Sequence, residues 1–99
     1  MKELPVLFTA LAGEDLDQIE DHISAHDPAA AARVRAAIVR QSLQLGKAPE
    51  KGMALRDPRG DQETGVRLWP VARYRNYLIL HRSEPDLIRV LRLLHAARD

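Results

Sequence analysis

The chain has 99 residues, a length at which one domain buries roughly two-thirds of its unfolded surface around a single core. It contains no cysteine, which excludes disulfide bonds, thiolate catalysis and zinc–thiolate sites and fits a reducing compartment. The formal net charge is +1, so only one surface, and not the whole chain, could hold a nucleic acid or an acidic partner. No stretch approaches the ~20 apolar residues of a membrane span, and no signal peptide is visible. We therefore expect one cytoplasmic domain over residues 1–99, with no cofactor and no metal.

Charge is distributed unevenly along the chain. Residues 1–27 carry one lysine against seven acidic residues, whereas residues 66–99 carry seven arginines against three acidic residues. This asymmetry predicts an arginine-rich surface in the C-terminal third that could hold an acidic partner or a nucleic acid. Ordinary solvated faces would give the same counts, so charge alone does not choose between these interpretations.

The first predicted elements are a short strand and a helix. Leu4–Phe8 is apolar and partly β-branched or aromatic, and Pro5 favours the start of a strand or an edge position. Thr9 can cap a helix over residues 10–25. The apolar residues of this helix recur at i, i+4, i+7 and i+11 and form one stripe, with acidic residues elsewhere: Ala12, Leu16, Ile19 and Ile23.

A second helix is predicted over residues 28–45. Asp27 is suited to its N-cap and Pro28 to its first turn, where a missing N–H does no harm, and Gly46 ends it. The link between the two helices is so short that they must form an αα-hairpin. Residues 46–65 then form a long connection, with four of the five glycines, in which Met53–Leu55 could add a short irregular strand.

The last third predicts three strands, separated by polar residues and a tight turn at Ser83–Asp86: 66–72, 74–81 and 87–95. Side chains alternate along a strand, which places Arg67, Trp69 and Val71 on one face. The order strand, helix, helix and three strands predicts an α+β fold, in which an antiparallel sheet carries the helical hairpin on one face. The other face must be covered by the long connection, closed by a partner, or left exposed to bind one.

Some residues in this third could carry chemistry. His81, Arg82, His95 and Arg98 are expected at the ends of neighbouring strands, where a base, an acid and phosphate-binding cations could cleave RNA through its 2′-hydroxyl. The same residues could instead bond to the backbone or to Asp99. Aromatic residues interleaved with arginines could stack on bases, but Trp69 and Tyr77 more simply fill the core. His22 and His26 have the spacing of a metal half-site, but without an evident third ligand they are better explained as solvated imidazoles.

Five segments occur along the chain in this order: Asp15–Ile19, the Asp27-Pro28 start of the second helix, VRLWPV at 66–71, YRNYLI at 74–79 and IRVLRLLHAARD at 88–99. Together they resemble the RelE/ParE superfamily of bacterial type II toxins. The resemblance covers nearly the whole chain and is weakest in residues 46–65. It implies a small toxin that is encoded beside an antitoxin, which wraps around it and neutralises it.

The resemblance also implies one of two targets. RelE-like members cut messenger RNA on the ribosome and typically carry Lys and Arg on the sheet face and a catalytic Tyr or His near the C-terminus, whereas ParE-like members inhibit DNA gyrase and are not nucleases. Residues 66–99 contain no lysine and the tail has no aromatic residue. These departures, with the YRNYLI segment and the His-Ala-Ala-Arg-Asp ending, favour the ParE branch.

The hypothesis is therefore a non-enzymatic gyrase inhibitor held by a ParD-like antitoxin with an acidic, amphipathic C-terminal segment. The expected antitoxin-binding residues are Arg67, Trp69, Arg73, Arg82 and Arg92, and the expected target-binding residues are His95, Arg98 and Asp99. In the nuclease alternative, His81 or His95 is the acid or base and Arg67 and Arg82 clamp the phosphate. A third possibility is an inactive binding module of the same fold.

Overall fold

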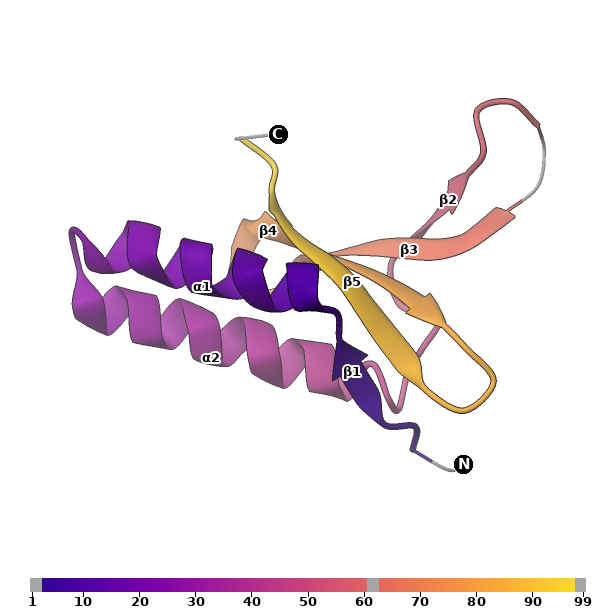
Figure 1. The fold of residues 1–99 in the computed structure, drawn as a ribbon, viewed down its shortest axis with the longest axis horizontal. Helices are drawn as coiled ribbons and strands as arrows, with labels where there is room; N and C mark the ends of the chain where they lie inside the picture. Colours follow the sequence, from indigo (N-terminus) through magenta and orange to yellow (C-terminus); the bar gives the residue numbers. More distant parts are fainter. Residues whose placement is uncertain (1–2, 61–62, 98–99) are drawn as a thin grey trace.

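The computed structural model of the protein describes residues 3–60 and 63–97. Its elements are, in order, β1 (Val6–Phe8), α1 (Ala10–Ser24), α2 (Pro28–Gln44), β2 (Met53–Arg56), β3 (Glu63–Val71), β4 (Tyr74–Ser83) and β5 (Ile88–His95). Figure 1 shows the two helices side by side along one part of a twisted sheet. The predicted α+β fold is confirmed, including the short strand in the long connection. Neither helix is long and apolar enough to cross a membrane within the described residues.

The five strands form one sheet in the order β1-β5-β4-β3-β2. The meander of β3, β4 and β5 is antiparallel, as predicted, and β2 adds to it antiparallel through β3. The prediction of an antiparallel sheet is wrong for β1, which pairs parallel with β5, Val6 lying opposite Ile88. Parallel strands need a long crossover connection, and here nearly the whole chain lies between β1 and β5. β1 is an edge strand and begins directly after Pro5, so both positions that Pro5 favours, a strand start and an edge, are found here.

Both helices begin at the predicted caps. The Thr9 hydroxyl accepts the Ala12 N–H at 3.0 Å, and the Asp27 carboxylate accepts the Ala30 N–H at 3.0 Å. In each case the side chain satisfies one of the N–H groups that the first helical turn leaves without an intrahelical partner. Each helix ends one residue before the predicted position.

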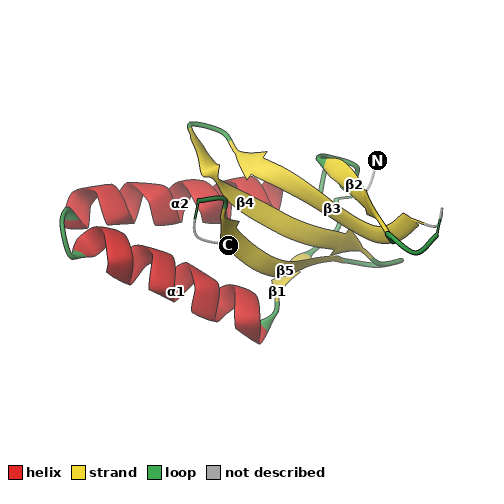
Figure 2. Ribbon diagram, turned by 90° about the horizontal axis from the view of Figure 1, so that it is seen from above, coloured by secondary structure: helices red, strands yellow, loops and turns green. Residues whose placement is uncertain are grey.

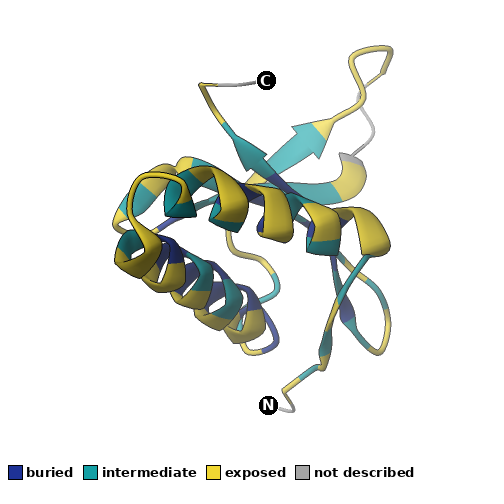
Figure 3. Cartoon of the chain, turned by 60° about the vertical axis from the view of Figure 1, so that its left-hand side comes forward, coloured by how far each residue is buried: buried dark blue, intermediate teal, exposed yellow. Residues whose placement is uncertain are grey.

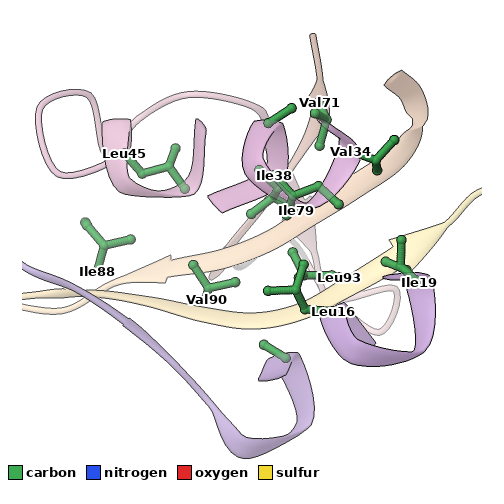
Figure 4. Packing of buried hydrophobic residues seen from close by; sticks show 12 residues of the cluster. Leu16, Ile19, Val34, Ile38, Leu45, Val71, Ile79, Ile88, Val90 and Leu93 are labelled. Atoms are coloured by element: carbon green, nitrogen blue, oxygen red, sulfur yellow. The ribbon is translucent and has the colours of Figure 1, made fainter. Parts of the chain in front are cut away.

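The hydrophobic core lies between the helical hairpin and one face of the sheet. Figure 4 shows Leu16 and Ile19 of α1 close to Leu93 of β5, and Ile38 of α2 beside Ile79 of β4. The stripe predicted on the first helix is confirmed, since its first three members are buried and Ile23 packs against them. We call this covered side the inner face of the sheet.

The end of α2 meets the segment before β1 at Gly46. The Leu4 N–H donates to the Gly46 carbonyl at 3.0 Å, and a Cβ atom on Gly46 would collide with the Leu4 carbonyl oxygen. Gly46 was predicted only as a helix stop. The structure shows that this position also requires glycine because another part of the backbone approaches it.

Candidate functional site

The outer face of the sheet, turned away from the helices, carries an apolar band. The strand register places Leu68 opposite Leu80, and it places Pro70 and Leu94 on either side of Leu78. All five residues are partly exposed. Figure 2 shows that the end of the sheet formed by β2 and β3 extends beyond both helices. The band is thus apolar surface that the packing of the hairpin leaves open.

An arginine cluster borders this band at the β4–β5 turn. Arg82 and Arg89 are register partners, and both donate to the Glu84 carboxylate, Arg82 at 3.2 Å and Arg89 at 2.7 Å. Hydrogen bonds from Arg89 and then Arg82 lower the pKa of Glu84 to about 2. The carboxylate therefore stays ionised at neutral pH, and the cluster carries one net positive charge beside the apolar band.

Asp15 closes the edge of β5 beyond the point where β1 stops. Its carboxylate accepts two hydrogen bonds from the Arg92 guanidinium, at 2.8 and 3.0 Å, and one from the Leu93 N–H at 2.9 Å. Burial acts to raise the pKa of Asp15, but these hydrogen bonds and the charge of Arg92 outweigh it and lower the pKa overall. Arg92, an expected antitoxin ligand, is thus engaged by α1.

Three other predicted site residues lie on the inner face and hold the 46–56 segment. The buried His81 donates from Nε2 to the Lys51 carbonyl at 2.9 Å, and Arg67 donates to the Gly52 carbonyl at 3.0 Å. The ammonium of Lys51 lies 4.7 Å from the centre of the Trp69 ring. Trp69 itself packs against the core, as its simpler interpretation proposed. These contacts give His81 and Arg67 structural roles.

The environment of His81 disfavours acid–base chemistry on a bound RNA. Its relative exposure is 0%, and its Nδ1 is buried without a hydrogen-bond partner. Burial lowers the pKa of the imidazole, a shift that the hydrogen bond to Lys51 opposes and the charge of Arg67 reinforces. His81 is therefore a neutral, inaccessible side chain at pH 7.

His95 lies at the other end of the sheet. It is opposite Tyr77, whereas His81 is opposite Val90, so the two histidines are four steps apart along β4, about 13 Å. The expectation that His81, Arg82 and His95 gather at neighbouring strand ends is wrong, because in a hairpin the end of one strand meets the start of the next. The His95 ring packs edge-on against Tyr77 at 4.8 Å, and its Nδ1 accepts the Ala97 N–H at 3.1 Å.

The remaining predicted residues do not join a common site. Arg73 is exposed in the β3–β4 turn, where its φ of 75° is left-handed. Arg98 and Asp99 lie outside the described residues. His22 and His26 are both exposed on the hairpin, and the described residues contain no group of three side chains suited to a metal.

Sequence reasoning missed the two carboxylates that organise the site. The sequence places Asp15 only in a resembling segment of an acidic helix, and Glu84 only in a turn. The hairpin register would have revealed Glu84, since a turn carboxylate lies within reach of arginines on both strands. Nothing in the periodicity indicates that Asp15 meets Arg92.

Two solved structures resemble this fold over nearly its full length. One is the chromosomal ParDE toxin–antitoxin system from P. aeruginosa, with a TM-score of 0.77 and 24% identity over 94% of this chain and 96% of that chain. The other is the toxin–antitoxin complex RelBE2 from Mycobacterium tuberculosis, with a TM-score of 0.66 and 26% identity over 95% of this chain and 99% of that chain. No curated protein sequence matches the chain.

The fold and these similarities define the class, a small toxin of a type II toxin–antitoxin system within the RelE/ParE superfamily. The family model described as "ParE toxin of type II toxin-antitoxin system, parDE" matches residues 6–99. The chain therefore belongs to the ParE toxin family.

Proposed function

We propose that this toxin arrests growth by inhibiting DNA gyrase in the cytoplasm and is neutralised by a ParD-like antitoxin that covers the outer face of its sheet. The observation that supports the antitoxin surface most directly is the partly exposed apolar band bordered by the Arg82–Arg89 cluster. Family membership and the likeness to a ParDE system support the choice of partner.

The chemistry of this surface fits an acidic, amphipathic chain. Apolar side chains of the partner would cover the band and exclude water from it. This burial contributes about 25 cal/mol of favourable free energy for each Å² of apolar surface removed from water. Acidic side chains would meet Arg82 and Arg89, whose single carboxylate leaves the cluster net positive. Such charge complementarity mainly speeds association and selects the partner.

Arg82 is the residue through which this surface is best tested. Replacing Arg67 disturbs the support of the 46–56 segment, because Arg67 bonds to Gly52, whereas the Arg82 side chain is 43% exposed. We expect Arg82→Glu to weaken antitoxin binding about tenfold in a calorimetric titration, while Arg75→Glu, at an exposed arginine elsewhere on β4, leaves it unchanged. Unchanged affinity for Arg82→Glu would remove this surface from the interface.

A ribosome-dependent messenger RNA nuclease is the second candidate, and the likeness to RelBE2 is the observation that favours it. The burial of His81 and its separation from His95 oppose it. Primer extension on translated messages, run with the purified toxin beside a gyrase assay, distinguishes the two. Cut messages with normal supercoiling would replace the gyrase proposal with the nuclease.

A binding module without toxicity is the third possibility. Expression of the chain alone in a bacterial host decides this, because a toxin arrests growth and an inactive module does not. Co-expression with the short reading frame encoded beside the gene should restore growth if its product is the antitoxin.

A further inference from the structure

The β3–β4 turn holds an arginine in a backbone conformation that arginine rarely adopts. Val71 and Tyr74 are register partners, so Ala72 and Arg73 form a two-residue loop between them. Arg73 has a φ of 75°, a left-handed value that glycine reaches without strain but that is unfavourable for a residue with a Cβ atom. Among the described residues, only glycines share a positive φ with it. Strain of this kind persists where the surrounding structure fixes it, and it is concentrated at functional positions.

Helix α2 fixes this turn through a buried side chain. Gln41 is 6% exposed, and its amide forms two hydrogen bonds with the Ala72 backbone. Its Oε1 accepts the Ala72 N–H at 2.7 Å, and its Nε2 donates to the Ala72 carbonyl at 3.1 Å. Tyr74, on the other side of Arg73, packs against the core. The backbone on both sides of Arg73 is thus held in place, whereas Arg73 itself is exposed.

The turn is positively charged, and the elements that hold it carry no acidic residue. Arg73 and Arg75 are both exposed, and neither forms an ion pair with any residue in the described part of the chain. Residues 28–49, which include α2, and residues 64–83, which include the turn, contain no Asp or Glu. Figure 3 shows exposed residues along the outward sides of both helices, and the charged residues of α2 are all arginines. The two cations of the turn therefore lack a counter-charge on either element.

The exposed residues of the turn offer no apolar anchor. They are Ala72, Arg73, Arg75 and Asn76, and the exposed large apolar side chains of residues 3–60 and 63–97 lie elsewhere: Leu7, Leu11, Leu43 and Met53. A protein interface usually depends on a desolvated core of aromatic or aliphatic anchors. Phosphates need no such anchor, because guanidinium groups bind them by charge and by paired hydrogen bonds. Duplex DNA carries one negative charge for about every 1.7 Å of its axis, so two arginines separated by one residue meet phosphates in any sequence.

We propose that the β3–β4 turn binds the phosphate backbone of duplex DNA through Arg73 and Arg75. The inference rests on the proposed function for the source of this DNA, because gyrase holds the duplex on which it acts. Tyr74, beside the turn, and Arg82, in the cluster assigned to the antitoxin, are eight steps apart along β4, about 26 Å. The toxin thus has separate surfaces for its antitoxin and for DNA, and the DNA contact adds to its affinity for gyrase bound to a duplex.

Fluorescence anisotropy of a short labelled DNA duplex, titrated with purified toxin from about 50 to 200 mM salt, measures this contact. We expect the wild type to bind with a Kd of about 10⁻⁴–10⁻⁶ M at physiological salt. Arg73→Gly and Arg75→Glu should each raise the Kd at least about threefold and reduce the salt slope of the affinity by about 1. Arg59→Gly is the matched control, because Arg59 is an exposed arginine in the connection at the other end of β3, and its Kd should stay close to the wild-type value.

Two substitutions of Arg73 separate a lost contact from a lost fold. Glycine adopts the left-handed conformation without strain, so Arg73→Gly should unfold at the wild-type temperature or above it in a thermal melt. Arg73→Lys keeps the positive charge at this position and should keep most of the duplex affinity. Weak binding by a stable Arg73→Gly, together with the affinity of Arg73→Lys, assigns the loss to the missing charge.

The outcomes separate this inference from the proposed function. Wild-type duplex affinity for both Arg73→Gly and Arg75→Glu, in a toxin that inhibits gyrase, would overturn the DNA contact and leave the proposed function standing. Duplex binding that both substitutions weaken, in a toxin that leaves supercoiling unchanged, would support the DNA contact and contradict the gyrase proposal. Loss of gyrase inhibition in both variants, without measurable duplex binding by the wild type, would overturn the DNA contact and assign the turn to an acidic surface of gyrase itself. Tighter binding of a single-stranded RNA of the same length would overturn the choice of DNA and assign the turn to RNA.

Discussion

Replacing Asp15 by alanine should destabilise the toxin far more than most changes at charged residues of a helix. The Asp15 side chain is only 12% exposed, and its carboxylate holds both the Arg92 guanidinium and the Leu93 N–H. A hydrogen bond to a charged group contributes about 1.5–3 kcal/mol, but the Arg92 side chain is 41% exposed, so water screens part of that ion pair. We expect a total loss of about 2–3 kcal/mol, or roughly 10–20 °C in the unfolding midpoint.

Urea or thermal unfolding followed by circular dichroism measures this loss. The matched control is Asp17→Ala on the same helix, because Asp17 is 68% exposed and its partner Arg35 keeps Glu20. The control should change the stability by no more than about 0.5 kcal/mol. If Asp15→Ala is as stable as Asp17→Ala, Asp15 does not secure the edge of β5.

The pH dependence gives a second check on Asp15. Its pKa is lowered in the folded state below the ordinary 3.8, so the ionised carboxylate stabilises the fold fully above that pH. The stability difference between wild type and Asp15→Ala should therefore be constant near neutral pH. It should shrink only as the pH falls below 3.8 through the lower folded pKa.

Three further substitutions test the fold around the site. Gly46→Ala should lower the free energy of unfolding by about 1–3 kcal/mol, because the added Cβ collides with the Leu4 carbonyl. Gly13→Ala in α1, where a Cβ meets nothing within 4 Å, should raise it by about 0.5–1 kcal/mol. Equal effects of the two substitutions in urea unfolding would contradict the contact at Gly46. Ile38→Ala should lower the free energy of unfolding by about 2–5 kcal/mol because the Ile38 side chain is fully buried. Leu11→Ala, at an exposed position, serves as its control. Because burial lowers the pKa of His81, the unfolded chain takes up its proton first, and stability should fall as the pH drops below 6.5. His81→Gln should flatten this slope below pH 6.5, and an unchanged slope in His81→Gln would show that His81 does not cause it.

The sequence predicted those parts of the fold that local chemistry determines. Thr9 and Asp27 cap the helices as expected, because capping depends on a side chain and an amide three residues away. The apolar stripe on α1 and the alternation in β3 follow in the same way from helical and strand periods. Backbone preferences alone also indicate the end of the second helix at Gly46 and a strand start or edge position at Pro5, which directly precedes the edge strand β1.

The candidate site was less predictable because it depends on pairings between distant residues. Asp15 and Arg92 are 77 positions apart, and no period in the chain relates them. The parallel pairing of β1 with β5 depends on how the chain returns after the whole meander. The residue type of His81 suggests acid–base chemistry, but its inward position against residues 51–52 gives it a structural role.

The central proposal is that this ParE-family toxin inhibits gyrase and that its antitoxin neutralises the toxin. A supercoiling assay with purified gyrase and increasing toxin, repeated after addition of the neighbouring reading frame's product, measures both halves together. We predict loss of supercoiling by the toxin and its recovery when the product is added. The proposal would be contradicted if gyrase supercoils normally at every toxin concentration while the same toxin still arrests growth when it is expressed.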